Sequence, residues 1–384
     1  MKKMLMLASV ASMIDQFNMP NIELLQKMGY EVHVACNFEK GSTCTEERIQ
    51  KLKKRLREIN VRYFQIDFSR SVLKVNEILK SYRQVKTLLL KEHYDFIHCH
   101  SPIGGVVGRI AGHKTHTKVI YTAHGFHFYK GAPLQNWLLY YPVEKWLSRY
   151  TDVLITINKE DYQRAKKKFH AKETKYIPGV GIDVEKIQAV QVDREKKREE
   201  LGIGKDDFLL LSVGELNKNK NHEAVIRAIA ELRNSKIKYA ICGKGLLKEY
   251  LEELAEKLGV RNQLFLLGFR TDVIEICKSA DVFVFPSKRE GLSVALMEAM
   301  ACGLPCVISR IRGNTDLINE CGGYGFDVSN KDTLIKKLKE VIKKGSLYKS
   351  NDKEKKILQF DTKNVNNMMT NIYLKILSYN SEEK

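Results

Sequence analysis

The sequence predicts an α/β protein of two domains, each built on a parallel sheet. Three observations carry this prediction. The chain has 384 residues, and a single hydrophobic core rarely grows past about 250–300 residues, so two domains are expected. Short apolar runs alternate with amphipathic helical stretches, which is typical of a parallel sheet with crossover helices. This alternation occurs in two successive sets, without a repeat of fixed period.

The first set opens with an apolar run at residues 3–8, directly after two lysines. A short signal peptide has a similar start, but the run is short and Asp15 follows at once. No other segment can serve as the first strand, so we expect a buried strand here. The elements that follow are a helix over 21–28 closed by Gly29, a strand over 31–36, a helix over 46–59, a strand over 61–66, a helix over 75–91, a strand over 96–98, a helix containing Gly104, Gly105 and Gly108, strands over 118–122 and 153–157, and a helix containing Lys166, Lys167 and Lys168.

Residues 176–181 then break regular structure, and a polar stretch follows. We place one domain at residues 1–185 and the other at 186–361, and we expect residues 362–384 to form a helix that packs back on the first domain. The elements expected in the second set are strands over 209–213, 239–242, 264–267, 282–285 and 305–309, and helices over 222–233, 246–258, 294–301 and 331–344.

The composition indicates which kind of partner the protein binds and in which cellular compartment it works. The formal net charge of +19 points to an anionic partner: a nucleic acid, an acidic lipid or a phosphorylated substrate. The eight cysteines are scattered without a C-x-x-C pair, which favours a reducing, cytoplasmic setting. No apolar run reaches the roughly 18 residues that a membrane span needs.

The segment from Arg289 to Pro305 is the most informative one. Glu290 lies in the turn after an apolar strand, and Gly291 permits a close backbone approach. Ser293 is a good N-cap for the next helix, whose free backbone N–H groups suit a diphosphate. Glu298 follows about one and a half turns into this helix. A bare pair of glutamates would be an ordinary surface feature, so the prediction depends on the surrounding motifs.

Those motifs resemble the retaining family-4 glycosyltransferases of GT-B fold, whose two Rossmann-like domains face each other across a cleft. The segment resembles the E-x7-E region of that family, and the similarity spans nearly the whole chain, most like members that build bacterial capsules and exopolysaccharides. It covers residues 213–221, 243–245, 267–273, 280–281, 303–305, 313–314 and 316–318, and in the first half His98-Cys99-His100-Ser101 and Thr122-Ala123-His124-Gly125-Phe126.

The resemblance implies a role for each matching residue. Glu290 would hold hydroxyls of the donor sugar, and Glu298 would accept hydrogen bonds from the ribose hydroxyls. Lys220 would pair with the donor diphosphate and stabilise it as the leaving group. His124 would lie near C6 of the transferred sugar; its alternative is a packing histidine. The other residues implied at the donor are Gly214, Asn217, Lys218, Gly243, Lys244, Phe269, Arg270, Gly291, Leu292 and Ser293.

The sequence departs from the family in two places. Many relatives carry an arginine where this chain has Glu215, whose carboxylate would repel a diphosphate. Two alternatives stay open: Glu215 turns away, or Lys218 or Arg289 supplies the missing cation. The loop expected at residues 9–16 has no glycine pair, so its contacts cannot be transferred from relatives. A different feature, His98 and His100 on one strand face, suggests a metal site, but no fourth ligand is evident and we expect core histidines.

The resemblance also implies a retaining hexosyl transfer from a nucleotide diphosphate sugar, with a uridine diphosphate carrier. The chain has no Asp-x-Asp, so we expect no metal and no other cofactor. The acceptor would be a saccharide or a lipid-diphosphate-saccharide. The basic helix over 46–59 and the lysines at 166–168 suggest peripheral contact with an anionic membrane from the cytoplasmic side.

Two rival functions stay open. A nucleotide-sugar 2-epimerase can share this architecture, although it resembles these motifs less well. A basic nucleic-acid-binding protein would need aromatic side chains among the basic ones, and the helix over 46–59 has none. A P-loop, a dinucleotide-binding G-x-G-x-x-G after the first strand and a G-x-S-x-G elbow are all absent from the sequence.

Overall fold

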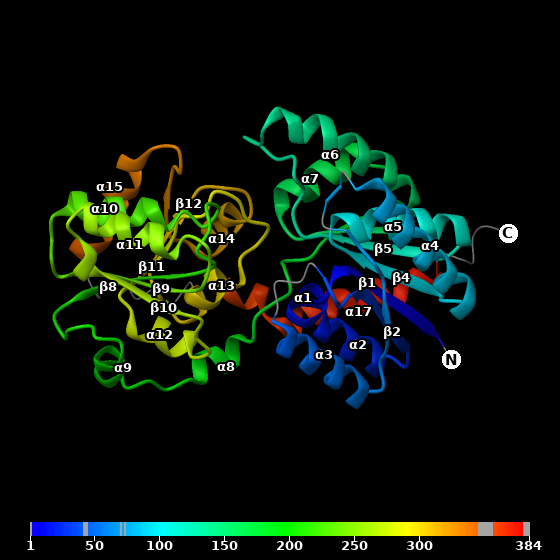
Figure 1. Ribbon diagram of the computed structural model, residues 1–384, viewed down its shortest axis with the longest axis horizontal. Helices are drawn as coiled ribbons and strands as arrows, with labels where there is room; N and C mark the ends of the chain where they lie inside the picture. Colours follow the sequence, from blue (N-terminus) through cyan, green and yellow to red (C-terminus); the bar gives the residue numbers. More distant parts are fainter. Residues whose placement is uncertain (1, 41–44, 70, 73, 345–355, 379–384) are drawn as a thin grey trace. The chain divides into compact units, whose positions relative to one another are not determined.

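The computed structural model describes residues 2–40, 45–69, 71–72, 74–344 and 356–378. The chain divides into two compact units, residues 1–180 with 365–384 and residues 181–364, each with one parallel sheet (Figure 1). The sequence predicted domain boundaries at residues 185/186 and 361/362, whereas the structure divides at 180/181 and 364/365.

The first unit is a seven-stranded sheet in the order β3-β2-β1-β4-β5-β6-β7. All its neighbouring strands pair in parallel. The apolar segment that could have been a signal peptide is β1, which lies between β2 and β4. The strands are β1 (Lys3–Val10), β2 (Glu31–Asn37), β3 (Arg62–Gln65), β4 (Phe96–His100), β5 (Lys118–Ala123), β6 (Val153–Thr156) and β7 (Glu173–Tyr176).

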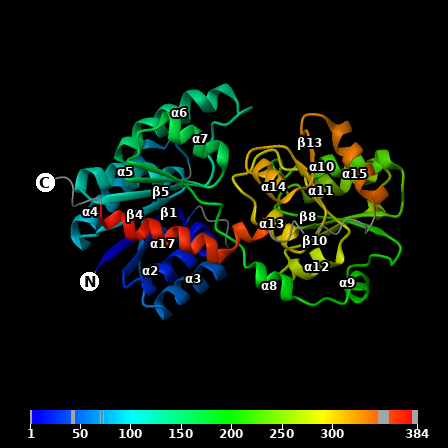
Figure 2. The same cartoon turned by 180° about the vertical axis from the view of Figure 1, so that it is seen from behind.

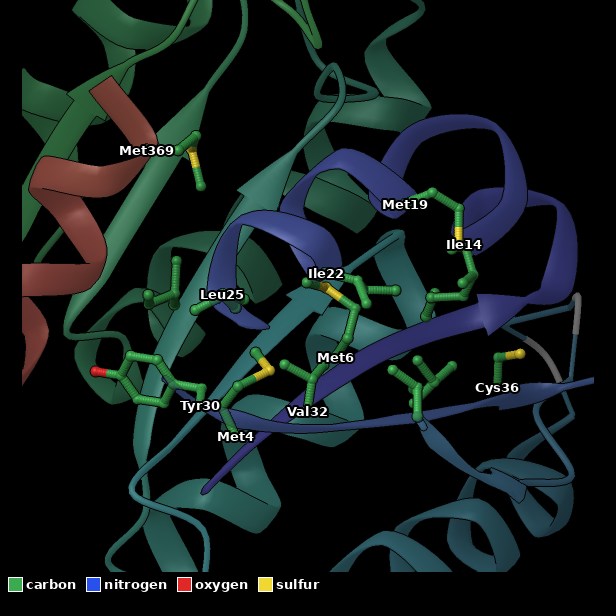
Figure 3. Packing of buried hydrophobic residues seen from close by; sticks show 14 of the residues in the cluster. Met4, Met6, Ile14, Met19, Ile22, Leu25, Tyr30, Val32, Cys36 and Met369 are labelled. Atoms are coloured by element: carbon green, nitrogen blue, oxygen red, sulfur yellow. The ribbon is translucent and has the colours of Figure 1, made fainter. Parts of the chain in front are cut away.

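Helices cover both faces of this sheet. One face buries α2 (Met19–Lys27), α3 (Glu46–Glu58) and α17 (Thr362–Ser378) in a methionine-rich core. Figure 3 shows Met4 and Met6 of β1 beneath Ile22 and Leu25 of α2. The other face buries α4 (Val75–Glu92), α5 (Pro102–Thr115), α6 (Leu134–Leu147) and α7 (Lys159–Lys168).

The helix α17 ties the end of the chain to the first unit. It carries four core side chains (Val365, Met369, Ile372 and Ile376) and Tyr373, which is fully buried. The hydroxyl of Tyr373 lies 2.9 Å from Nδ1 of His98 on β4, and Lys118 on β5 donates to backbone carbonyls at the end of the helix. Figure 2 shows α17 running along the face of this unit that carries α2 and α3.

The second unit is a six-stranded parallel sheet in the order β10-β9-β8-β11-β12-β13. Its strands are β8 (Phe208–Val213), β9 (Ile237–Cys242), β10 (Leu264–Gly268), β11 (Val282–Phe285), β12 (Cys306–Ser309) and β13 (Tyr324–Phe326). Its helices are α8 (Val184–Ala189), α9 (Arg194–Glu200), α10 (His222–Leu232), α11 (Lys248–Lys257), α12 (Val273–Ser279), α13 (Val294–Ala301), α14 (Asn314–Cys321) and α15 (Lys331–Lys344).

The structure corrects the expected first loop. Residues 9–16 are not a loop: β1 continues to Val10, α1 (Ala11–Met13) begins at once, and a π-helical segment (Ile14–Asn18) leads into α2. Single π-helical turns inside helices often mark functional positions. The polar stretch after residue 190, for which the sequence predicted no element, holds α9. No helix in the described part of the chain combines the length and the apolar character that a bilayer crossing requires.

Candidate active site

The second unit places the predicted carboxylates and lysine at its topological switch point. The strands β8 and β11 are neighbours, and the order runs through β9 and β10 on one side and through β12 and β13 on the other. In open parallel sheets, ligands bind beyond the carboxyl ends of the strands where the order reverses. The loop after β8 carries Lys220 and the loop after β11 carries Glu290, so the sheet topology explains why residues 70 positions apart meet.

Three asparagine contacts lock these two loops together. The backbone N–H of Lys288 donates to the carbonyl of Asn219 (2.8 Å), and the Asn219 side chain donates to the carbonyl of Arg289 (3.0 Å). Asn221 has a left-handed φ of +57° and donates to the carbonyl of Pro286 (3.2 Å). The left-handed region tolerates asparagine better than most residues. The pair of loops is therefore a preformed frame.

Lys220 and Glu290 form an ion pair inside this frame. The Nζ of Lys220 donates to Oε1 of Glu290 at 2.7 Å, and both side chains are largely buried. The aliphatic stem of Lys220 packs over Gly214, where an added Cβ would lie 3.1 Å from it, and its Nζ lies 5.0 Å from the centre of the Phe285 ring. The ammonium of Lys220 and the carboxylate of Glu290 therefore compensate each other's charge in this site.

Glycines let the loops at this end of the sheet touch backbone to backbone. A Cβ on Gly243 would lie 1.9 Å from the carbonyl oxygen of Gly214. Gly313 has a φ of +79°, and a Cβ there would lie 2.0 Å from the carbonyl oxygen of Gly291. Contacts this short are impossible for a real side chain. Glycine at both positions therefore lets the loops after β8 and β9, and those after β11 and β12, pack closely together. We call the loops that follow β8, β9, β10, β11 and β12 at the carboxyl end of the sheet the rim.

Glu298 lies on the half-buried stripe of α13. Ser293 begins this helix as expected: it accepts a hydrogen bond from the backbone N–H of Leu296. Burial raises the pKa of the Glu298 carboxyl, and no hydrogen bond or ion pair within the described residues satisfies it. An unpaired, partly desolvated carboxylate is suited to accept hydrogen bonds from hydroxyl groups of a ligand.

The remaining predicted donor residues lie on the same rim, with different side-chain exposure. Asn217 accepts from the backbone N–H of Lys220 (2.9 Å) and donates to the exposed carboxylate of Glu215 (3.0 Å). Lys218 is exposed. The side chain of Arg270 is committed to ion pairs with Asp272 and Glu200. The other side chains that we expected near the donor are partly or fully accessible: Lys244, Phe269, Arg289 and Leu292.

In the first unit, His124 follows β5 and extends a row of histidines on β4, in which His98 and His100 are buried while His124 is partly exposed. His98 is bonded at both ring nitrogens, by the hydroxyls of Tyr373 (2.9 Å) and Thr122 (2.8 Å). Nδ1 of His100 lies 3.0 Å from Nε2 of His124. His98 thus has the contacts of a core histidine, as we expected. Tyr373, which fixes it, was not predicted, because nothing local in the sequence links two residues 275 positions apart.

A hollow of about 30 Å³ opens beside these rings. His100, His124, Phe17 and Asn18 are among the residues that line it. The buried Nε2 of His100, one of the lining residues, has no hydrogen-bond partner among the described residues, whereas buried polar atoms are normally paired with protein, water or ligand. Phe17 and Asn18 were not predicted as site residues: they lie between the loop expected at 9–16 and the helix expected at 21–28, in the π-helical segment that leads into α2.

Burial keeps these histidines neutral. It lowers the pKa of His98 to about 3 and that of His124 to about 4, and it holds the pKa of His100 well below its usual value, with the other two rings as secondary causes. At neutral pH, His124 is therefore a hydrogen-bonding group without charge. It can orient a hydroxyl through its ring nitrogens, but it lacks the second ring proton that a general acid would transfer.

The same shifts predict a loss of stability in acid. The unfolded chain protonates histidine below about pH 6.5, whereas the folded rings do not, so the unfolded state binds more protons between pH 6.5 and about 4. The free energy of unfolding should fall across this window as pH decreases, by up to about 1.4 kcal/mol per pH unit for each histidine. We expect His124→Gln to flatten this slope in urea titrations carried out across the pH window. Equal slopes in wild type and His124→Gln would contradict the assignment.

Comparison with known proteins reveals extended similarity. The family model for group 1 glycosyl transferases matches residues 193–357, and the Glycosyltransferase Family 4 model matches residues 22–186. The putative glycosyltransferase EpsD of Bacillus subtilis is 36% identical over 393 residues, covering 100% of this chain and 99% of the relative. The Escherichia coli UDP-Gal:alpha-D-GlcNAc-diphosphoundecaprenol alpha-1,3-galactosyltransferase is 31% identical over 302 residues, covering 76% and 75%.

Solved structures share the fold. The crystal structure of Anabaena HepE in complex with UDP superposes with a TM-score of 0.78 at 19% identity, covering 98% of this chain and 100% of that one. A sucrose-phosphate synthase from Thermosynechococcus elongatus gives a TM-score of 0.79 at 16% identity, covering 99% and 100%. The predicted two-domain α/β architecture is thereby confirmed.

Proposed function

Because the chain belongs to the glycosyltransferases that the group 1 and family 4 models describe, we propose that it moves a hexose from a UDP-sugar to a lipid-linked saccharide. The chain is a transferase of GT-B fold. The observation that carries the proposal for its donor is the array at the switch point of the second unit: the Lys220–Glu290 pair and the unpaired carboxylate of Glu298, framed by loops that need glycine.

The proposed donor fits the charges of this array. The Lys220 ammonium would pair with the diphosphate, and the N-terminal turn of α13 would add backbone N–H donors. Release of Glu290 from Lys220 would free its carboxylate for sugar hydroxyls. The carboxylate of Glu298 would accept from the ribose. Support for uridine comes from HepE, which was crystallised with UDP and with UDP-glucose.

The proposed acceptor rests on relatives. The Escherichia coli relative is named for a diphosphoundecaprenol-linked acceptor, as is a Campylobacter jejuni transferase that is 32% identical over 171 residues. We therefore assign this chain a lipid-diphosphate-saccharide acceptor in the assembly of a surface polysaccharide, at the cytoplasmic face of a membrane.

The proposed mechanism retains the anomeric configuration. As the bond between the sugar and the diphosphate loosens, an oxocarbenium-like centre forms and Lys220 stabilises the negative charge on the departing phosphate. The acceptor hydroxyl attacks from the face that the diphosphate leaves, and a phosphate oxygen takes its proton. We propose that Lys220 and the α13 N-terminus make a metal ion unnecessary.

Nucleotide binding tests this proposal. We expect UDP to raise the apparent melting temperature of the whole chain in the presence of EDTA, more than GDP or ADP does, because a ligand that binds only the native state stabilises it by about 2.7 kcal/mol at a hundredfold excess over its dissociation constant. Glu298→Ala should abolish the shift, while Glu256→Ala, an exposed carboxylate on α11, should preserve it. A UDP shift that survives in Glu298→Ala would remove the residue from the site, and a shift only with divalent metal would overturn the metal-free proposal.

A further inference from the structure

The helix α6 turns an apolar face to solvent. Seven of its side chains are exposed, and only Gln135 among them is polar. Leu134 and Leu138 are 73% and 70% exposed. We call the other six side chains the α6 face: Leu134, Leu138, Leu139, Pro142, Val143 and Trp146. Patches of this kind on an otherwise soluble surface mark interaction sites.

The opposite side of α6 packs against the first unit. The α6 face is therefore exposed although the helix itself is anchored in the fold. Glu144 forms a buried ion pair with Arg109 on α5 (2.8 Å). Trp137 contacts the ring of Phe128 (5.6 Å between centroids), and Tyr141 contacts Phe169 (5.9 Å). Figure 1 shows α6 at the outer edge of the first unit with α7 beside it.

The exposed charges of the chain segment that contains α6 have one sign. The lysines of this segment at the end of α7 belong to a helix that contacts α6 through Arg164, which lies 5.0 Å from the centre of the Trp137 ring. Between residues 126 and 170, every exposed Lys, Arg, Asp or Glu side chain is cationic. The acidic residues of this segment are buried or only partly accessible. The exposed cations are Lys130, Arg149, Lys159, Lys166, Lys167 and Lys168. Both tryptophans of the chain lie on α6, and tryptophan favours the boundary between lipid and water.

We infer that the α6 face, with the cations beside it, docks this chain on an anionic lipid bilayer, with α6 lying in the plane of the interface. An interfacial helix needs an apolar face and adjacent basic residues, and here the two occur together. The inference rests on the proposed lipid-linked acceptor, since docking would hold the first unit where such an acceptor is anchored.

The basic helix that the sequence favoured for this task is less suitable. Its apolar residues, Ile49, Leu52 and Leu56, all face the core of the first unit. Four of its six cations are ion-paired within the described structure, so much of its charge is already compensated. These pairs are Arg48–Asp15, Lys51–Glu47, Lys54–Glu58 and Arg55–Glu23.

Tryptophan fluorescence of the full chain tests the inference. In Trp137→Phe, Trp146 is the only tryptophan, and it is exposed. We expect its emission to shift to shorter wavelength on vesicles of phosphatidylcholine with phosphatidylglycerol, and to be quenched by brominated acyl chains. Adding Leu138→Gln and Val143→Gln should weaken vesicle binding about tenfold or more, because two apolar side chains no longer enter the lipid. Leu374→Gln on α17, also exposed, is the matched control and should bind like the parent.

Reversing the charge of three lysines on α7 tests the electrostatic contribution to vesicle binding separately from the insertion of apolar side chains. Lys166→Glu, Lys167→Glu and Lys168→Glu together should weaken binding to the anionic vesicles about tenfold or more. An unshifted, unquenched Trp146 on anionic vesicles would overturn the inference. So would a lipid-free dimer that Leu138→Gln and Val143→Gln dissociate, because the α6 face would then bind a second copy.

The shift in melting temperature that UDP causes in the same samples distinguishes a failure of the docking proposal from a failure of the proposed donor. A chain that binds UDP and fails to bind vesicles contradicts only the docking surface. A chain that binds vesicles and no nucleotide contradicts the proposed donor.

Discussion

Lys220→Ala is expected to lower kcat by about 10²–10³-fold, the loss seen when one preorganised charge-stabilising group is removed from a transition state. The physical reason is the position of its Nζ, 2.7 Å from Glu290 within the loops at the switch point. This ammonium would meet the negative charge that develops on the leaving diphosphate. Steady-state kinetics with the UDP-sugar and acceptor measure the effect.

Two further variants make this prediction specific. Lys257→Ala removes an exposed lysine on α11 of the same unit and should leave kcat unchanged. Lys220→Ala also leaves Glu290 without its partner, so the double variant Lys220→Ala/Glu290→Gln should recover stability without recovering kcat. Full activity of Lys220→Ala, or rescue of kcat in the double variant, would show that Lys220 has only a structural role.

Gly313→Ala is expected to remove most transferase activity and donor binding although residue 313 carries no side-chain chemistry. Its new Cβ would lie 2.0 Å from the carbonyl oxygen of Gly291, so the loop that carries Glu290 must move. The nearby Arg312 side chain donates to the Glu290 carbonyl (3.3 Å), and this contact would be lost with the loop. A displacement of about 1 Å in such a site can reduce a rate about 10²-fold.

Gly259→Ala is the matched control for this substitution. Gly259 belongs to the same unit and has a φ of +72°, close to the +79° of Gly313, but nothing lies within 4 Å of its would-be Cβ. Both variants therefore impose similar backbone strain, and only Gly313→Ala adds the clash. Equal losses of UDP affinity in the two variants would refute the proposed loop frame.

The sequence predicted the regular part of the fold well, because buried parallel strands produce continuous apolar runs. The strand at 282–285 and the helices at 294–301 and 331–344 have the predicted limits. The helix α6 was missed because its apolar residues lie on both sides: Trp137 and Tyr141 pack inward while Leu138 and Trp146 face solvent. Such a helix lacks the one-sided periodicity on which the prediction depended.

The site was harder to predict, because its geometry depends on contacts between distant segments. Sequence could place Lys220, Glu290 and Glu298 after particular strands, but it could not show that the first two pair with each other. Gly313 belongs to the motifs of the resemblance, but nothing local in the sequence shows that it and Arg312 contact the Glu290 loop. The partners of His98 and His124 likewise come from other elements.

The most direct test of the central claim is the anomeric configuration of the product, followed by NMR in the presence of EDTA. The full chain is supplied with a UDP-sugar and a diphosphate-linked saccharide acceptor. We expect release of UDP that depends on the acceptor, and a new glycosidic bond with the donor's anomeric configuration. An inverted linkage would contradict the proposed mechanism, and an isomerised donor without transfer would contradict the assignment as a transferase.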